Sequence, residues 1–182
     1  MVGQIPTKWR EVVRHSLFRG PIASEVGEPE QVFLGEYTHT LDDKGRLTLP
    51  ARWREELSEG VVITRGLDPC LLILPASTFE NIARKMDQLG FNKSDARALS
   101  RYLFAKAIDD TPDKQGRVNI PSNLREFAGI NGDALIVGVN NWIEIWSVGR
   151  YREANAQLES NVGEASERVG DVLQRALLEK KE

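Results

Sequence analysis

The sequence predicts an α+β fold built from two tandem copies of one β-rich unit, with helices between the copies and after them. Residues 41–57 return as residues 111–128, with a constant offset of 71 from Asp42 and Asp113 onward, which indicates a duplication. Beside each repeat, hydrophobic and polar residues alternate with period two, as they do in strands with one buried face. Apolar residues three or four positions apart predict helices in residues 77–106 and from residue 151 onward.

Composition limits the class of protein and the kinds of site. The chain has 182 residues, 41% of them hydrophobic, which suits one or two compact domains and is too short for an elaborate multidomain enzyme. The net charge is −3, so any nucleic-acid site has to be a local patch. Cys70 is the only cysteine, which excludes an internal disulfide and fits a reducing cytoplasm. No stretch approaches the roughly 18 apolar residues of a membrane helix, so we expect a soluble cytoplasmic protein without membrane contact.

The first copy, which we place at residues 36–78, is predicted to form a strand, a tight turn, a second strand, a short helix and a further hairpin. From Phe33 onward, the alternating positions expected on one strand face are Phe33, Tyr37, His39 and Leu41 and, after the turn, Leu47 and Leu49. Gly45 supplies the positive φ that a tight hairpin needs. Pro50 ends the strand and opens a short helix over residues 51–57. Two more strands are expected at residues 61–65 and 70–75.

The second copy, at residues 107–150, repeats this order. Pro121 opens a helix over residues 122–128, and strands are expected at 134–139 and 142–146.

Helices are predicted in the spacer, residues 79–106, and in the tail, residues 151–182. The spacer carries an apolar stripe, which we interpret as a packing surface: Phe79, Ile82, Met86, Leu89, Leu99 and Leu103. A break is expected at Gly90-Phe91-Asn92, with Ser94 as the N-cap of the next helix. The tail is expected to be helical, interrupted near Gly163 and frayed at its end.

Each copy contains an aspartate and an arginine four residues apart across a glycine turn. These residues are Asp42, Gly45 and Arg46 in the first copy, and Asp113, Gly116 and Arg117 in the second, each 71 positions on. A single such pair would ordinarily brace its turn, but two copies in a duplicated hairpin favour a function. An arginine on such a turn presents a rigid donor fork suited to guanine O6 and N7 or to phosphate. The aspartate can hold that fork in one orientation.

Three runs of the sequence resemble the MraZ proteins of bacteria, which belong to the AbrB-like swapped-hairpin superfamily: VFLGEYTHTLDDKGRLTLPARWREEL, PCLLILP and DKQGRVNIPSNLREFAGI. The similarity covers residues 32–150 and implies two tandem SpoVT-AbrB-type modules. It implies a regulator that binds short G-rich direct repeats in promoter DNA ahead of the division and cell wall gene cluster, usually as a repressor. It further implies association with the nucleoid and a ring-shaped homo-oligomer.

Residues 1–31 form an extension that this family normally lacks, because its members begin with Met directly before the Phe-x-Gly strand and Val32 stands there instead. Residues 20–30 are rich in Gly, Pro and Glu. We expect the extension to be disordered and dispensable, or to arise from a misassigned gene start.

The two copies are expected to contribute unequally to DNA binding. Arg46 is predicted to read bases, with Lys44, Arg52 and Arg54 as further DNA-binding residues. The second copy has Gln115 and Asn123 where the first has Lys44 and Arg52. We therefore predict that Asp113, Gly116 and Arg117 mainly brace structure, as Asp42 and Gly45 do in the first turn.

Two other classes of function compete with DNA binding. An enzyme would need an acid, base or nucleophile constellation, and the only histidines are His15 and His39. The adjacent carboxylates Asp42-Asp43 and Asp109-Asp110 should point apart, and no Gly-rich phosphate loop is present, so no catalytic residue, metal or cofactor is expected. The stronger alternative is an antitoxin-like or structural protein-interaction module of the same fold.

Overall fold

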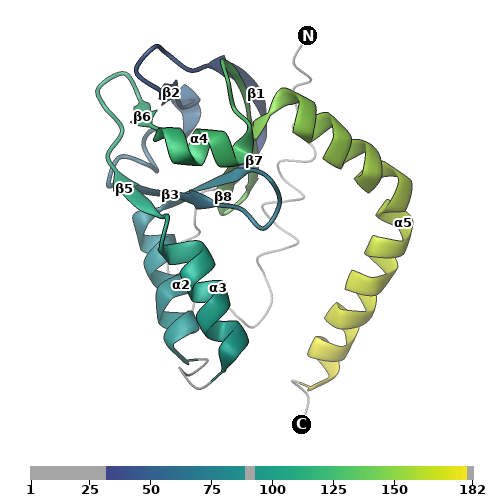
Figure 1. Cartoon of the computed structure of the whole chain (residues 1–182). Coiled ribbons are helices and arrows are strands. Elements are labelled where there is room, and N and C mark those ends of the chain that lie inside the picture. The colour runs from purple at the N-terminus through teal and green to yellow at the C-terminus, as the bar shows by residue number, and fades with distance from the viewer. Residues whose placement is uncertain (1–31, 89–92, 180–182) are drawn as a thin grey trace. The chain divides into compact units, whose positions relative to one another are not determined.

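The computed structural model describes residues 32–88 and 93–179 (Figure 1). Within these residues, the strands are β1 (Phe33–Thr40), β2 (Arg46–Thr48), β3 (Val61–Arg65), β4 (Leu71–Pro75), β5 (Ile108–Asp110), β6 (Arg117–Asn119), β7 (Asp133–Asn140) and β8 (Trp142–Ser147). The helices are the 3-10 helix η1 (Ala51–Trp53) and the α-helices α2 (Ala76–Gln88), α3 (Ser94–Phe104), α4 (Ser122–Ala128) and α5 (Val148–Glu179). The extension at residues 1–31 and the break expected at residues 90–92 lie outside the described residues.

The strands of the two copies interleave. Six of them form an antiparallel sheet in the order β1-β7-β8-β4-β3-β5, and β2 pairs with β6 in a separate two-stranded ribbon. β1 of the first copy pairs with β7 of the second along its whole length, from Phe33 opposite Asn140 to Thr40 opposite Asp133. β5 of the second copy likewise pairs with β3 of the first. The predicted α+β fold with tandem swapped hairpins is confirmed, and each of the two sheets contains strands of both copies.

Both copies contribute to a single hydrophobic core, as expected for units of about 40 residues that cannot bury enough apolar surface alone. The inner face of the ribbon provides four fully buried side chains, which are Leu47, Leu49, Val118 and Ile120. Trp53 packs edge-on against Phe33 and Tyr37 of β1, with ring centroids 5.6 and 5.0 Å apart. The core therefore fixes the ribbon and both of its turns against the sheet.

The short helix predicted after Pro50 is only the single 3-10 turn η1. The Ser58 hydroxyl donates a hydrogen bond to the Glu55 carbonyl at 2.6 Å, and hydrogen-bonded turns replace the rest of the expected helix. Its counterpart α4 forms as predicted and ends at Gly129, whose φ of 65° suits a left-handed helix end.

Two details of the predicted helices are wrong. Ser94 is the first residue of α3, after the N-cap Lys93, and its hydroxyl bonds the Asp95 carboxylate at 3.2 Å instead of capping a backbone N–H. The tail helix α5 is not interrupted near Gly163 and runs unbroken from Val148 to Glu179. A glycine costs a helix interior only about 1 kcal/mol relative to alanine, which the long helix accommodates.

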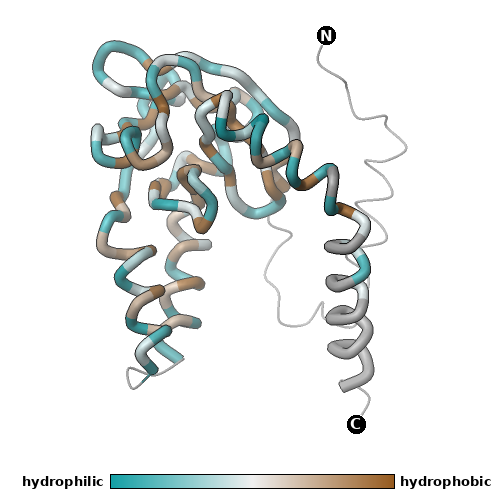
Figure 2. The backbone as a smooth tube through the Cα atoms, turned by 45° about the vertical axis from the view of Figure 1, so that its right-hand side comes forward, coloured by the Kyte–Doolittle hydropathy of each residue, from teal (hydrophilic) through white to brown (hydrophobic). Residues whose placement is uncertain are grey.

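The spacer helices α2 and α3 lie side by side, and the other described residues cover them only in part (Figures 1 and 2). Phe79 meets Phe104 with ring centroids 5.0 Å apart. Hydrophobic and hydrophilic segments alternate along both helices in Figure 2. Ile82 and Met86 are half-buried and Leu99 is exposed, so the predicted packing stripe is partly open within one chain. No helix among the described residues is long and apolar enough to span a membrane.

Gly138 lets β1 and β7 approach closely, which gives a test of their pairing. A Cβ atom at this position would lie 2.6 Å from the backbone nitrogen of Leu34 and from the carbonyl carbon of Phe33. Gly138→Ala should therefore push the strands apart and cost about 1–3 kcal/mol of unfolding free energy, measured by thermal unfolding. Gly163→Ala is the control, because nothing lies within 4 Å of the added methyl and the helix should gain slightly. An unchanged melting temperature for Gly138→Ala would contradict the pairing.

Candidate nucleic-acid interface

The first turn is organised by the carboxylate of Asp42. Its Oδ1 accepts hydrogen bonds from the backbone N–H groups of Lys44 at 3.0 Å and Arg46 at 2.9 Å. Its Oδ2 accepts a hydrogen bond from Nε of Arg46 at 2.7 Å and lies 2.6 Å from Nη2 of the same arginine. These bonds leave Nη1 and the outer N–H of Nη2 unused, and the Arg46 side chain is 31% exposed. Two parallel N–H donors therefore remain at the tip of the guanidinium.

The second turn has the same geometry. Oδ1 of Asp113 accepts the backbone N–H groups of Gln115 at 2.9 Å and Arg117 at 3.0 Å. Its Oδ2 accepts Nε of Arg117 at 2.7 Å and lies 2.6 Å from Nη2. Gly45 and Gly116 have φ of 78° and 74°, so both turns need glycine. In both copies, therefore, the aspartate and the arginine stabilise their own turn, which is the ordinary role of such a pair.

The arginines keep both aspartates ionised. Hydrogen bonds from Arg46 lower the pKa of Asp42 to about 2, and hydrogen bonds from Arg117 lower the pKa of Asp113 to about 2. Each depressed pKa stabilises the turn above pH 3.8, the ordinary value, and the benefit is lost as the pH falls toward 2. At neutral pH the two guanidinium groups are therefore held in fixed orientations.

Both signature arginines lie on the outer face of the ribbon. The register pairs Arg46 with Asn119, Leu47 with Val118 and Thr48 with Arg117. Because Leu47 and Val118 point into the core, their neighbours Arg46 and Arg117 point to the opposite face. Diagonal cross-strand neighbours have Cα atoms roughly 7–8 Å apart. One chain thus presents two guanidinium groups on the same face of the ribbon, each bonded to the aspartate of its own turn.

Each turn is covered by an arginine of the other copy. A Cβ atom on Gly45 would lie 3.1 Å from Cζ of Arg125, and one on Gly116 would lie 2.2 Å from Nε of Arg54. The strands are also cross-linked, since Leu49 donates its N–H to the carbonyl of Gly116 and Ile120 donates to that of Gly45. Arg125 was missed from the sequence, although the offset of 71 residues that pairs it with Arg54 was visible.

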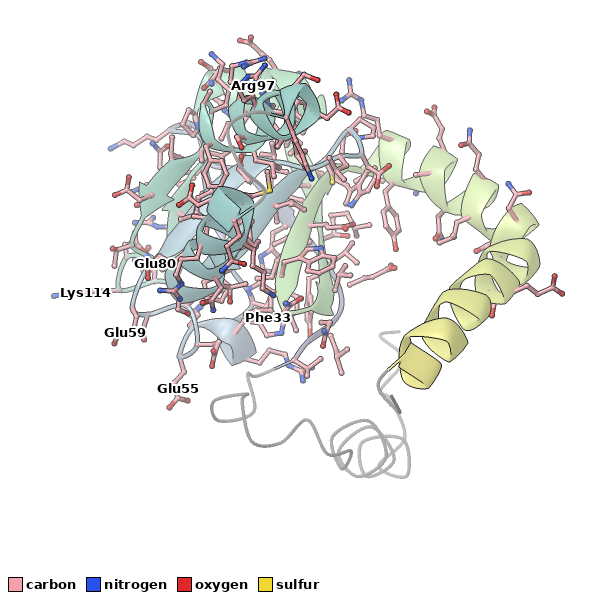
Figure 3. The ribbon with its side chains drawn as sticks, turned by 90° about the horizontal axis from the view of Figure 1, so that it is seen from below. Phe33, Glu55, Glu59, Glu80, Arg97 and Lys114 are labelled. Carbon is pink, nitrogen blue, oxygen red and sulfur yellow. The ribbon has the colours of Figure 1, made fainter. Side chains whose placement is uncertain are left out.

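The other predicted DNA-binding residues, Lys44, Arg52 and Arg54, lie in three different surroundings. Lys44 and Lys114 are exposed at the two turns, and Lys114 extends away from the protein in Figure 3. Arg52 is exposed and donates from Nη1 to the Tyr37 hydroxyl at 3.3 Å. Arg54 donates from Nε to the Leu49 carbonyl at 3.1 Å and lies at the second turn, so it is not grouped with Arg46.

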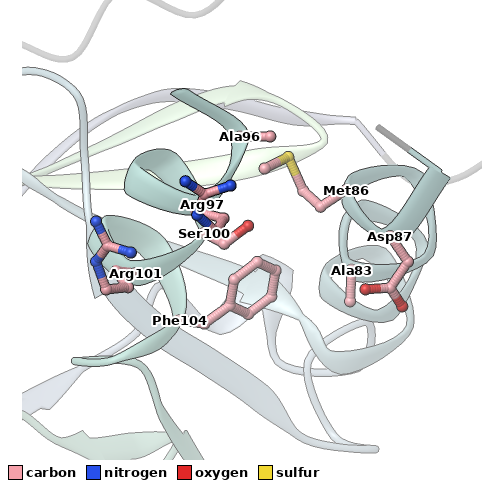
Figure 4. A pocket seen from close by; sticks show the side chains of 8 residues that line it. All are labelled: Ala83, Met86, Asp87, Ala96, Arg97, Ser100, Arg101 and Phe104. Carbon is pink, nitrogen blue, oxygen red and sulfur yellow. The ribbon is translucent and has the colours of Figure 1, made fainter. Parts of the chain in front are cut away.

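Other features of the described residues are less suited to a functional site. An open hollow of about 330 Å³ lies between α2 and α3, where Met86, Arg97 and Phe104 face it (Figure 4). Burial raises the pKa of the Cys70 thiol to about 12, which leaves it a poor nucleophile. Nδ1 of His39 bonds the Thr48 carbonyl, which is a structural role. Within residues 32–88 and 93–179, no group of three or more His, Cys, Asp or Glu side chains could hold a metal ion.

Comparison with known proteins agrees with the duplication. The family model described as "MraZ protein, putative antitoxin-like" matches residues 32–102 and again residues 103–172. The transcriptional regulator MraZ of Roseiflexus sp. (strain RS-1) is 45% identical over 141 residues, which cover 78% of this chain and 99% of that protein. The protein of the same name from Moorella thermoacetica is 47% identical over 122 residues, which cover 67% of this chain and 85% of that protein. The protein of the same name from Desulforamulus reducens is 40% identical over 142 residues, which cover 78% of this chain and 100% of that protein.

Proposed function

The chain belongs to the MraZ family of transcriptional regulators, and we propose that it acts by binding specific double-stranded DNA with the outer face of the β2-β6 ribbon. The observation that carries the proposal is the pair of matched turns, which hold the guanidinium groups of Arg46 and Arg117 in fixed orientations on that face. A guanidinium group held in a fixed orientation suits the recognition of a base, and the exposed lysines of the turns suit contact with phosphates. The protein is a regulator and not an enzyme.

We assign the main contact with bases to Arg46, whose two free donors match O6 and N7 of one guanine. Lys44 and Arg52 contact phosphates on either side of that base. The target is a set of short G-rich direct repeats in the promoter of the gene's own division and cell wall cluster, where binding represses transcription and places the protein on the nucleoid. This target follows from the family resemblance and from the preference of arginine for guanine.

We further propose that the protein assembles into a closed ring of identical subunits. Each chain leaves apolar side chains open to solvent: Leu99 on α3 and Leu158 and Val162 on α5 are 37%, 54% and 55% exposed. Head-to-tail contacts through such surfaces close into a ring when their rotation permits. Several turns acting together give usable affinity to a chain with a net charge of −3.

Light scattering of the full chain is expected to show a stable homo-oligomer at micromolar concentration. Leu158→Glu combined with Val162→Glu should reduce its size, because charges would replace the exposed apolar side chains of α5. A monomeric wild-type protein would contradict the assembly.

The test of DNA binding is an electrophoretic shift assay on the DNA upstream of the protein's own gene. We expect a shifted complex that a scrambled duplex of the same composition does not compete away. Equal competition by both duplexes would reject sequence-specific recognition.

An antitoxin-like role is the second candidate, favoured by the description of the matched family. Antitoxins of this superfamily usually carry one module and a long disordered tail, whereas this chain has two copies and the helix α5. Co-purification of a stoichiometric toxin partner, with loss of the partner's activity in the complex, would favour this role over regulation by the protein alone.

A further inference from the structure

Arg125 belongs to the second copy but its side chain lies against the first turn. It projects from α4 so that a Cβ atom on Gly45 would be 3.1 Å from its Cζ and 3.2 Å from its Nη2. Gly45 directly precedes Arg46, the residue assigned to guanine. Only the missing side chain of Gly45 allows this approach, so the turn of one copy and the arginine of the other form a single local structure.

The guanidinium of Arg125 has no partner among the described residues. Its Nε is buried without a hydrogen bond, and the ion pairs of the described residues join Asp42 to Arg46 and Asp113 to Arg117. Asp42 cannot take it, because both of its oxygens already accept bonds from the turn. A partly buried cation without a counter-charge costs free energy. Because Nε is buried and the side chain as a whole is only half-buried, an incoming anion would bind the terminal nitrogens and offset that cost through its charge.

Arg54 occupies the equivalent position at the second turn and differs in this respect. Its Nε donates to the Leu49 carbonyl at 3.1 Å, and it is in closer contact with Gly116 than Arg125 is with Gly45. Arg54 is therefore fastened to the protein, whereas Arg125 is not. This difference separates two turns whose aspartate–arginine geometry is otherwise the same.

We propose that Arg125 binds a backbone phosphate of the DNA strand whose base Arg46 contacts, and that Arg54 braces the second turn. The proposal rests on the DNA-binding function proposed above. The first recognition unit is then composite, with Asp42, Lys44 and Arg46 from one copy and Arg125 from the other. The phosphate supplies the anion that the protein lacks at this position, and Lys44, exposed on the same turn, adds a second positive charge.

The experiment compares Arg125→Met with the matched variant Arg54→Met in the full chain. Binding to the upstream duplex and to a scrambled duplex is measured by fluorescence anisotropy over a range of salt concentrations, together with melting temperature. Arg125→Met should weaken binding to both duplexes by the same factor. It should also reduce the steepness with which the logarithm of the binding constant falls with the logarithm of the salt concentration, by about 0.9 for each engaged subunit. Its melting temperature should stay near that of the wild type. Arg125→Lys should restore most of the slope, because the slope depends on the number of positive charges that displace counterions from the DNA.

Arg54→Met should show the reverse, with a lower melting temperature and a wild-type salt slope. A wild-type slope for Arg125→Met, or a fall in its melting temperature as large as that of Arg54→Met, would overturn the proposal while leaving the proposed function standing. Equal binding of both duplexes by the wild type would instead reject sequence-specific recognition. Absence of any DNA binding by the wild type would reject both.

Discussion

Arg46→Ala is expected to abolish specific DNA binding while the assembly stays intact. A bidentate arginine–guanine contact discriminates between bases by roughly 1–3 kcal/mol, and the loss is multiplied when several subunits engage one DNA molecule. Arg46 is 31% exposed and lies on the outer face of the ribbon, away from the core. Anisotropy titrations should show that the variant binds the upstream and scrambled duplexes equally, with an unchanged oligomer size.

Arg117→Ala is the matched control, because Arg117 has the same hydrogen bonds to Asp113 that Arg46 has to Asp42. We expect nearly unchanged DNA affinity and a somewhat lower melting temperature, since Asp113 loses its counter-charge. The expected difference comes from the surroundings: residues 38–54 hold four basic and two acidic residues, whereas residues 109–125 hold three of each. Loss of specific binding in Arg117→Ala with retention in Arg46→Ala would reverse our assignment of the two copies.

Trp53→Ala should produce the largest loss of stability in the described part of the chain. Trp53 is 1% exposed and packs edge-on against two aromatic rings of β1. Removing so large a buried side chain costs about 3–5 kcal/mol, equivalent to a fall in melting temperature of roughly 6–20 °C for a chain of this size. Trp53→Phe should lose less, because it keeps a ring in the same space. Equal melting temperatures for Trp53→Ala and the wild type would show that packing of Trp53 against β1 does not stabilise the fold.

Local features of the sequence predicted much of the fold. The duplication, the glycine turns, strands β3, β4, β7 and β8 and the helix α4 follow from residue spacing and turn chemistry. The aspartate–arginine pairing at each turn also depends on residues only four positions apart. Such features need no knowledge of distant parts of the chain.

Features that depend on distant contacts were not predicted in detail. The alternation in residues 33–41 predicts a strand but does not identify β7 as its partner, since many strands share that period. The contact between Arg125 and Gly45 joins positions 80 residues apart in the sequence and exists only because the hairpins are exchanged. The short η1 reflects a local competition, in which the Ser58 hydroxyl takes the Glu55 carbonyl, and helix propensity alone does not resolve it.

The most direct test of the account is a double-mutant cycle between Arg46 and the guanines of the upstream duplex. Replacing a guanine by 7-deazaguanine removes its N7 acceptor without changing base pairing. We predict that at least one such replacement weakens wild-type binding but has no effect on Arg46→Ala, so that the two changes are coupled by about 1 kcal/mol or more per contact. If every replacement weakens the wild type and Arg46→Ala equally, Arg46 does not contact guanine N7, and the recognition mechanism proposed here is contradicted.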